Sequence, residues 1–354
     1  MRRELNFYRS RWVWTLIALI SAPPGDGSAF GDAVGAGELR RFEFTQAQMG
    51  LPFRIVVYAP TMPIAAAAVR ATYEQVARLN MVFSDYETES EVSRLSRSSG
   101  QGRAVSVSQD LWQVLWNAKR WEKETAGALD VTVGPYVGLW RKARREGKLP
   151  DKYYLDKARG SVGGDKWRLE EVDRTVELTA PRMWLDLGGI AKGYVLDQAL
   201  QVMTGQGLDR VLLQAGGDIF CGSPPPGKMG WRIEVPGDDG QDELMIQIQN
   251  RALATSGDYY QFVEIDGVRY SHIIHPQTGL GLSNRIQVSV VASNAMTADA
   301  LATSLCVLGP ERGVQLVRGQ QDVGYRMIFQ GAGKKSNFTS EGFQKWVIAT
   351  GQEK

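Results

Sequence analysis

The order of helix-like and strand-like segments constrains this fold most. Apolar residues recur with helical spacing in residues 63–80, 108–125, 190–203, 295–308 and 311–317. Strand patterns lie at 41–48, 53–58, 210–214, 231–235, 244–248, 286–291 and 325–329, with a predicted three-strand meander at 167–170, 175–178 and 183–186. The regular alternation of a doubly wound parallel sheet is absent. We therefore predict an α+β fold in which helices pack on a largely antiparallel sheet, as one mixed domain over residues 40–350.

The first residues are typical of an export signal. Arg2, Arg3, Arg9 and Arg11 flank the start of an apolar run over residues 12–22, which is short for a membrane-spanning helix. Residues 1–29 are therefore predicted to be a signal peptide or an N-terminal anchor. The protein would then be exported to the periplasm or the outer face of the cytoplasmic membrane, with membrane association through the N-terminus if the leader is retained. A buried first helix is the alternative.

Composition excludes several classes of function. The chain has 41 Lys and Arg against 39 Asp and Glu, so it lacks the basic excess of a general nucleic-acid-binding protein. Cys221 and Cys306 are too few for a cysteine-based zinc site. His272 and His275 are the two histidines of the whole sequence, which excludes a histidine-rich metal cage. Any metal should therefore be a hard cation on oxygen ligands.

Two glycine pairs lie at predicted corners of the chain. In residues 184–194, Asp186 ends a strand-like run, Gly188 and Gly189 form a turn, and Lys192 lies in the helix that starts there. Such a corner can bring backbone N–H groups and a lysine to a phosphate. The alternative is a plain strand–helix turn. The second pair, in residues 214–219, is predicted to be a structural bend beside the site.

The histidines lie three residues apart before a Pro-x-Thr-Gly turn. Histidine suits proton transfer near neutral pH, so one of His272 and His275 is a candidate general base. The alternative is a pair of loop histidines with structural hydrogen bonds.

A candidate metal site lies in residues 296–303. Asp299 and Thr303 are four residues apart, so on a helix they share one face and can present two oxygens to one point. Two protein oxygens can be enough for Mg²⁺, because water and substrate phosphates complete its coordination shell. The alternative for Asp299 is a charge that interacts with the helix dipole.

Together these segments resemble the FAD:protein FMN transferases, the ApbE family. The resemblance runs from about Phe44 to Leu308 and follows the family's order. The motifs that carry it are Met49-Gly50, FSDY at 83–86, SEVSRL at 90–95, GALDVTVGP at 127–135, DLGGIAKGY at 186–194, AGGDI at 215–219, TSGDY at 255–259, SHII-P-TG at 271–279 and MTADALAT at 296–303.

The resemblance implies a T-fold-like core and Mg²⁺-dependent transfer of FMN from FAD to a Thr or Ser hydroxyl of an acceptor flavoprotein, with release of AMP. It implies that His272 is the base and that Asp299, Thr303 and the backbone carbonyl of Gly189 are metal ligands. It also implies flavin-nucleotide contacts at Met49, Tyr86, Ala128, Leu129, Asp130, Asp186, Lys192 and Ile273.

The chain departs from the family pattern at two positions. His275 and Gln277 stand where the family commonly has Asp and Arg. This change leaves two alternatives to the transferase: a non-catalytic flavin-binding protein and a Mg²⁺-dependent FAD pyrophosphatase that passes FMN to water.

Overall fold

The computed structural model describes residues 38–237, 243–258, 261–320, 322–331 and 334–348. Leu39–Lys354 form one compact unit, and the expected α+β class is confirmed. The export signal expected in residues 1–29 lies outside the described residues. Within the described ranges, no helix combines the length and the apolar character needed to span a bilayer.

The centre of the fold is an eight-stranded sheet in which every neighbouring pair is antiparallel. Its first two strands are joined by a two-residue turn, Met49-Gly50, in which both residues have positive φ angles, as a tight hairpin requires. The strand order is β1 (Arg40–Gln48), β2 (Leu51–Ala59), β6 (Val211–Ala215), β7 (Asp218–Cys221), β10 (Arg251–Gly257), β13 (Arg285–Ala292), β14 (Gly324–Gly331) and β15 (Lys334–Thr339).

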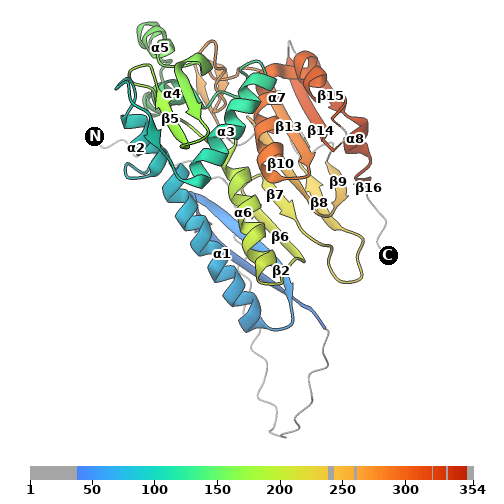
Figure 1. Cartoon of the computed structure of the whole chain (residues 1–354). Coiled ribbons are helices and arrows are strands. Elements are labelled where there is room, and N and C mark those ends of the chain that lie inside the picture. The colour runs from blue at the N-terminus through green and yellow to red at the C-terminus, as the bar shows by residue number, and fades with distance from the viewer. Residues whose placement is uncertain (1–37, 238–242, 259–260, 321, 332–333, 349–354) are drawn as a thin grey trace, which may run out of the picture. The chain divides into compact units, whose positions relative to one another are not determined.

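The middle strands are buried on both faces. On β2, Ile55 and Val57 point into one core and Val56 into another, as the two-residue period of a strand requires. The first, here called the helix-side core, contains residues from α1 (Met62–Phe83), α6 (Ala191–Gly205) and α7 (Ala295–Val317), which cover that face (Figure 1). On the opposite face pack β8 (Trp231–Val235), β9 (Leu244–Ile248), β16 (Val347–Ile348) and α8 (Glu341–Gln344).

A smaller region of short elements adjoins α1 and α6. Its three-stranded sheet has the order β3 (Val105–Ser106), β5 (Thr175–Leu178) and β4 (Trp167–Glu170), and the hairpin of β11 (Phe262–Ile265) and β12 (Val268–Ser271) is separate. Tyr136, Trp140, Leu155, Ile265 and Ile274 belong to its own apolar cluster, here called the α4 core. The helices are α2 (Glu91–Arg97), α3 (Gln109–Glu124), η1 (Val131–Val133), α4 (Gly134–Glu146), α5 (Lys152–Arg159) and η2 (Gly164–Lys166).

Most predicted elements are confirmed within a few residues, but one prediction needs correction. Residues 183–186 are not the third strand of a meander: the N–H of Leu185 donates to Oγ of Ser96 and the N–H of Asp186 to the carbonyl of Val131, so no ladder forms. The two helices expected at 295–308 and 311–317 are confirmed as the two parts of α7, which are separated by non-helical backbone at Gly309, where φ is 67° and ψ is −175°, just before Pro310.

Helices α6 and α7 pack unusually closely at Gly193. A Cβ at this position would lie 2.2 Å from the carbonyl oxygen of Ala295, and the Gly193 N–H donates to Oδ2 of Asp299 at 3.0 Å. Asp197 of α6 fixes the same junction, because its carboxylate accepts from the N–H groups of Ala295 and Met296 at 2.7 and 3.0 Å. The start of α7 is therefore held by α6 through backbone contacts.

We expect Gly193→Ala to lower the free energy of unfolding by about 3 kcal/mol, because the new methyl group meets backbone that cannot move away cheaply. Gly205→Ala is the matched control on the same helix, since a Cβ there has no neighbour within 4 Å. It should raise the free energy of unfolding by about 0.5–1 kcal/mol. Urea unfolding of both variants measures the difference, and equal stability would contradict the close-packing argument.

Candidate active site

Three charged side chains meet where α6, α7 and β7 converge. Nζ of Lys192 lies 2.8 Å from Oδ1 of Asp299 and 3.0 Å from Oδ2 of Asp218, and it also donates to the carbonyl of Gly188 at 3.1 Å. Both carboxylates are almost fully buried. Two acids therefore share one ammonium group, and the cluster carries an excess negative charge when all three are ionised.

The electrostatics of this cluster follow from burial and proximity. Burial alone would lower the pKa of Lys192, but the two carboxylates outweigh it and raise the pKa above its ordinary value. Burial raises the pKa of Asp218 to about 6, and repulsion from Asp299 adds to the rise, while Lys192 opposes both. Lys192 thus stays charged at neutral pH.

Sequence reasoning assigned Lys192 and Asp299 to the site but missed Asp218. The segment 214–219 was predicted to be a bend, and it is: Gly216 and Gly217 form the turn from β6 to β7. The available signal was a carboxylate at the start of a strand whose other residues are apolar, since such a charge is rarely buried without a partner.

Gly189 and Thr303 adjoin the charged cluster. A Cβ built on Gly189 would lie 3.0 Å from Cγ2 and 3.2 Å from Oγ1 of Thr303, and 3.3 Å from Cδ1 of Leu129. Oγ1 of Thr303 is in turn 3.3 Å from Oγ of Ser256. The structure therefore brings Gly189, Leu129 and Thr303 together, and Asp299 lies one helical turn before Thr303 on α7. Any larger side chain at position 189 would fill the space beside the Thr303 hydroxyl.

These residues fit a hard cation. Among the described residues, no three His, Cys, Asp or Glu side chains gather around one point, so a metal here would depend on carboxylate, hydroxyl and carbonyl oxygens. Those are the ligands that Mg²⁺ prefers. Oδ2 of Asp218 is buried and, within the described part of the chain, takes part in an ion pair but in no hydrogen bond of good geometry. Asp299, Thr303 and Gly189 are thus chemically suited to hold Mg²⁺.

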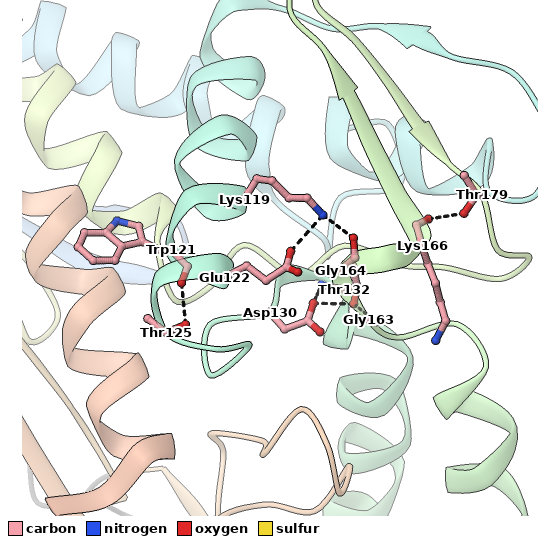
Figure 2. A network of polar contacts seen from close by, with 10 residues as sticks. All are labelled: Lys119, Trp121, Glu122, Thr125, Asp130, Thr132, Gly163, Gly164, Lys166 and Thr179. Atoms are coloured by element: carbon pink, nitrogen blue, oxygen red, sulfur yellow. Dashed lines mark hydrogen bonds and ion pairs between the residues drawn. The ribbon is translucent and has the colours of Figure 1, made fainter. Parts of the chain in front are cut away.

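The segment before η1 lies against this corner. Ala128 and Leu129 are buried, and Oδ1 of Asp130 accepts from the N–H and the hydroxyl of Thr132 at 2.8 and 2.6 Å. The same hydroxyl oxygen accepts from the N–H of Gly163 at 2.7 Å (Figure 2). Burial raises the pKa of Asp130, although the Thr132 hydrogen bonds oppose the shift. The Asp130 carboxylate is therefore held by its own loop.

A lysine extends this network. Nζ of Lys119 on α3 donates to the carbonyl of Gly164 and lies 3.4 Å from Oε2 of Glu122 (Figure 2). It thereby ties α3 to η2, whose preceding residue Gly163 contacts Thr132. The position of residues 128–130 thus depends on a network that no local sequence motif revealed.

Tyr86 lies beside an arginine of α4, and Asp186 is close enough to Asp85 to add to the rise that burial causes in the pKa of that carboxyl. Arg141 on α4 pairs with Asp85 at 2.6 Å, and its guanidinium lies 3.9 Å from the ring centroid of Tyr86 and 5.2 Å from that of Trp184. Tyr86 itself is 76% exposed. Oδ1 of Asp186 accepts from the Gly188 N–H at 2.8 Å, so its carboxylate shapes the glycine turn.

Met49 reaches the site region through its hairpin. Leu51, which follows the turn, lies 3.5 Å from where a Cβ on Gly216 would be, and Gly217 would similarly place a Cβ 3.0 Å from the Thr255 carbonyl oxygen. The β1–β2 turn therefore adjoins the turn that leads into Asp218.

His272 is half-buried just after β12. Its Nδ1 lies 3.2 Å from the carbonyl oxygen of Gln261; because a carbonyl only accepts, the neutral ring carries its hydrogen on Nδ1 and its lone pair on Nε2. Burial lowers the pKa of His272 to about 4, with contributions from Arg144 and Lys192. The imidazole is thus neutral at pH 7 and can accept a proton. Ile273, the next residue, is buried in the helix-side core.

The departures at 275 and 277 lie together in one turn. Nδ1 of His275 accepts from the Gln277 N–H at 3.2 Å, and the His275 carbonyl accepts from Gly279 at 2.9 Å. Burial lowers the pKa of His275, and Arg312 adds to the shift. Gln277 is exposed. His275 therefore stabilises its own turn.

Fold and site together define a class: an α+β protein whose buried acids and lysine, with a glycine turn and a threonine, suit a hard cation and a phosphate. The chain belongs to the ApbE family, whose model matches residues 49–329.

Two relatives and two solved structures agree. The FAD:protein FMN transferase of Vibrio cholerae serotype O1 is 36% identical over 249 residues, 69% of this chain and 74% of that protein. The enzyme of that name from Haemophilus influenzae is 33% identical over 276 residues, 74% and 80% of the two chains. The flavin transferase ApbE structure from Vibrio cholerae has a TM-score of 0.77 at 31% identity, covering 87% of this chain and 99% of that one. The ApbE protein of Thermotoga maritima has a TM-score of 0.77 at 29% identity, covering 88% and 100%.

We expect the His272 imidazole to titrate with a pKa of about 4, well below that of an unperturbed histidine. Because the pKa of His272 is lower in the folded protein than in the unfolded chain, the unfolded chain binds the proton more readily below pH 6.5. The free energy of unfolding therefore falls as the pH is lowered from 6.5 toward 4. NMR titration of the ring protons measures the value.

Only two histidines contribute signals, so His275→Asp assigns them by removing one. A midpoint at or above 6.5 for the remaining signal would show that His272 is solvated rather than desolvated in the native protein.

Proposed function

We propose that this protein is a Mg²⁺-dependent FAD:protein FMN transferase that attaches FMN to a Thr or Ser hydroxyl of an acceptor flavoprotein. The observation that supports this most is the group formed by Lys192, Asp299, Gly189 and Thr303, within electrostatic range of a neutral His272. Membership of the ApbE family, whose relatives bear this name, supports the same reaction.

The reaction would be a phosphoryl transfer with all atoms accounted for. The acceptor hydroxyl oxygen forms a bond to the FMN phosphorus, the pyrophosphate P–O bond breaks, and AMP leaves with the electron pair. Nε2 of His272 takes the hydroxyl proton, because Nδ1 already carries a hydrogen that faces Gln261. The depressed pKa keeps this nitrogen unprotonated at neutral pH, so the base is ready without prior loss of a proton.

The remaining residues would bind and orient. Asp299, Thr303 and the Gly189 carbonyl would hold the cation, which when bound supplies charge neutralisation on the pyrophosphate oxygens. Lys192 adds positive charge at the start of α6, where a helix N-terminus also favours phosphate. Leu129 and Ile273 are buried apolar walls, and Met49, Tyr86, Asp130 and Asp186 would contact the flavin nucleotide.

His272→Ala should lower FMN transfer by about 10²- to 10⁴-fold while FAD still binds, because it removes the base but no part of the cation site. The assay follows flavin fluorescence of an acceptor domain and AMP release together, with and without a chelator. His275→Ala is the matched control and should retain activity.

The same assay separates the alternatives. AMP release without a labelled acceptor would identify an FAD pyrophosphatase, and intact FAD in the presence of Mg²⁺ would identify a non-catalytic flavin-binding protein. Full activity in the His272 variant would eliminate that residue as the base.

We also propose that the protein is exported to the periplasm or the outer face of the cytoplasmic membrane. Support comes from Arg2, Arg3 and the apolar run at residues 12–22. A fusion of residues 1–40 to a reporter active only outside the cytoplasm should give activity, and Arg2→Glu with Arg3→Glu should reduce it. A silent wild-type fusion would refute export.

A further inference from the structure

The pairing of one ammonium with two buried carboxylates needs an explanation. Lys192 contacts Asp299 at 2.8 Å and Asp218 at 3.0 Å, and one carboxylate would be enough to neutralise it. Burying a second carboxylate is costly unless it is matched by positive charge. The excess negative charge therefore points to a cation that joins the cluster.

A cation at Asp299 would compete with Lys192 for the same carboxylate. Oδ1 of Asp299 already faces the ammonium, and Oδ2 accepts from the Gly193 N–H. Two positive charges on one carboxylate repel each other strongly in a buried setting. Lys192 must then keep other acceptors, and it has two within reach: Asp218 at 3.0 Å and the Gly188 carbonyl at 3.1 Å.

We propose that Asp218 is a positioning residue for the cation site: it holds Lys192 when a divalent cation binds Asp299, so that the carboxylate of Asp299 can turn to the metal while the lysine stays charged and in place. This inference rests on the magnesium-dependent function proposed above.

The surrounding backbone suits such a role. Asp218 begins β7 directly after the Gly216–Gly217 turn, where a Cβ on Gly217 would lie only 3.0 Å from the Thr255 carbonyl oxygen. Lys192 and Asp299 are likewise fixed by the close contact of α6 and α7 at Gly193. The ammonium can thus keep its contact with Asp218, whose backbone is fixed, when the carboxylate of Asp299 turns to a cation.

The test measures the affinity of the full chain for Mn²⁺ by electron paramagnetic resonance, in the absence and in the presence of FAD. Asp218→Asn should weaken Mn²⁺ binding by about 10- to 100-fold, the range seen when a residue that orients a metal ligand is changed. Asp218→Glu, which keeps the charge, should restore most of the affinity.

A double-mutant cycle with Lys192→Met separates positioning from simple charge. If Asp218 acts through the lysine, Asp218→Asn should have a much smaller effect in the Lys192→Met background than in the wild type. An equal effect in both backgrounds would show that Asp218 acts on the cation directly and would overturn the proposal. Lys192→Gln replaces Lys192→Met if the latter does not fold.

Two further results would also overturn it: unchanged Mn²⁺ affinity in folded Asp218→Asn, and no Mn²⁺ binding by the wild type with or without FAD. Folding is checked by thermal unfolding without metal. The flavin-transfer assay is run separately on the wild type. If the wild type labels the acceptor but Asp218→Asn does not change the Mn²⁺ affinity, the proposed function stands and only this inference is overturned.

Discussion

The ammonium group of Lys192 is the contact on which the architecture of the site depends. It joins α6 to α7 through Asp299 and to the central sheet through Asp218. Removing one partner from such a buried group leaves an uncompensated charge, which is far more damaging than the net benefit of the intact pairing suggests. The close contact at Gly193 has the same geometric origin, because the two helices must approach for the Gly193 N–H to reach the carboxylate of Asp299.

Local periodicity was enough to predict most elements, and it placed Asp299 and Thr303 on one face of a helix, as the structure has them. Contacts between residues distant in sequence could not be predicted in this way. Lys192 and Asp299 are 107 residues apart, and Arg141 and Asp85 are 56 apart. A pattern read along the chain gives no information about such pairs, so neither the Arg141–Asp85 pair nor the role of Asp218 beside Lys192 could be predicted. The strand expected at 183–186 failed for a related reason: its backbone partners are Ser96 and Val131, which only the tertiary fold brings near.

The two departures from the family pattern are easier to understand once their surroundings are known. His275 and Gln277 satisfy each other within a turn, through the Gln277 N–H and Nδ1 of His275. An Asp at position 275 could accept from the same N–H with a carboxylate oxygen, so the hydrogen-bonding function of the position survives the change. Because an acidic and a basic residue are replaced together, the net charge of the turn is also almost unchanged.

The position of His272 does not rely on that turn. The next two residues enter different apolar clusters, Ile273 in the helix-side core and Ile274 in the α4 core. The backbone on the N-terminal side is fixed as well, since the His272 N–H donates to the Gln261 carbonyl at 3.0 Å and the N–H of Ser271 to that of Leu282 at 2.8 Å. A segment anchored on both sides and in two cores has little freedom to follow changes three residues away. The imidazole can therefore keep its place and its depressed pKa while residues 275 and 277 vary, which is what the role proposed for His272 requires.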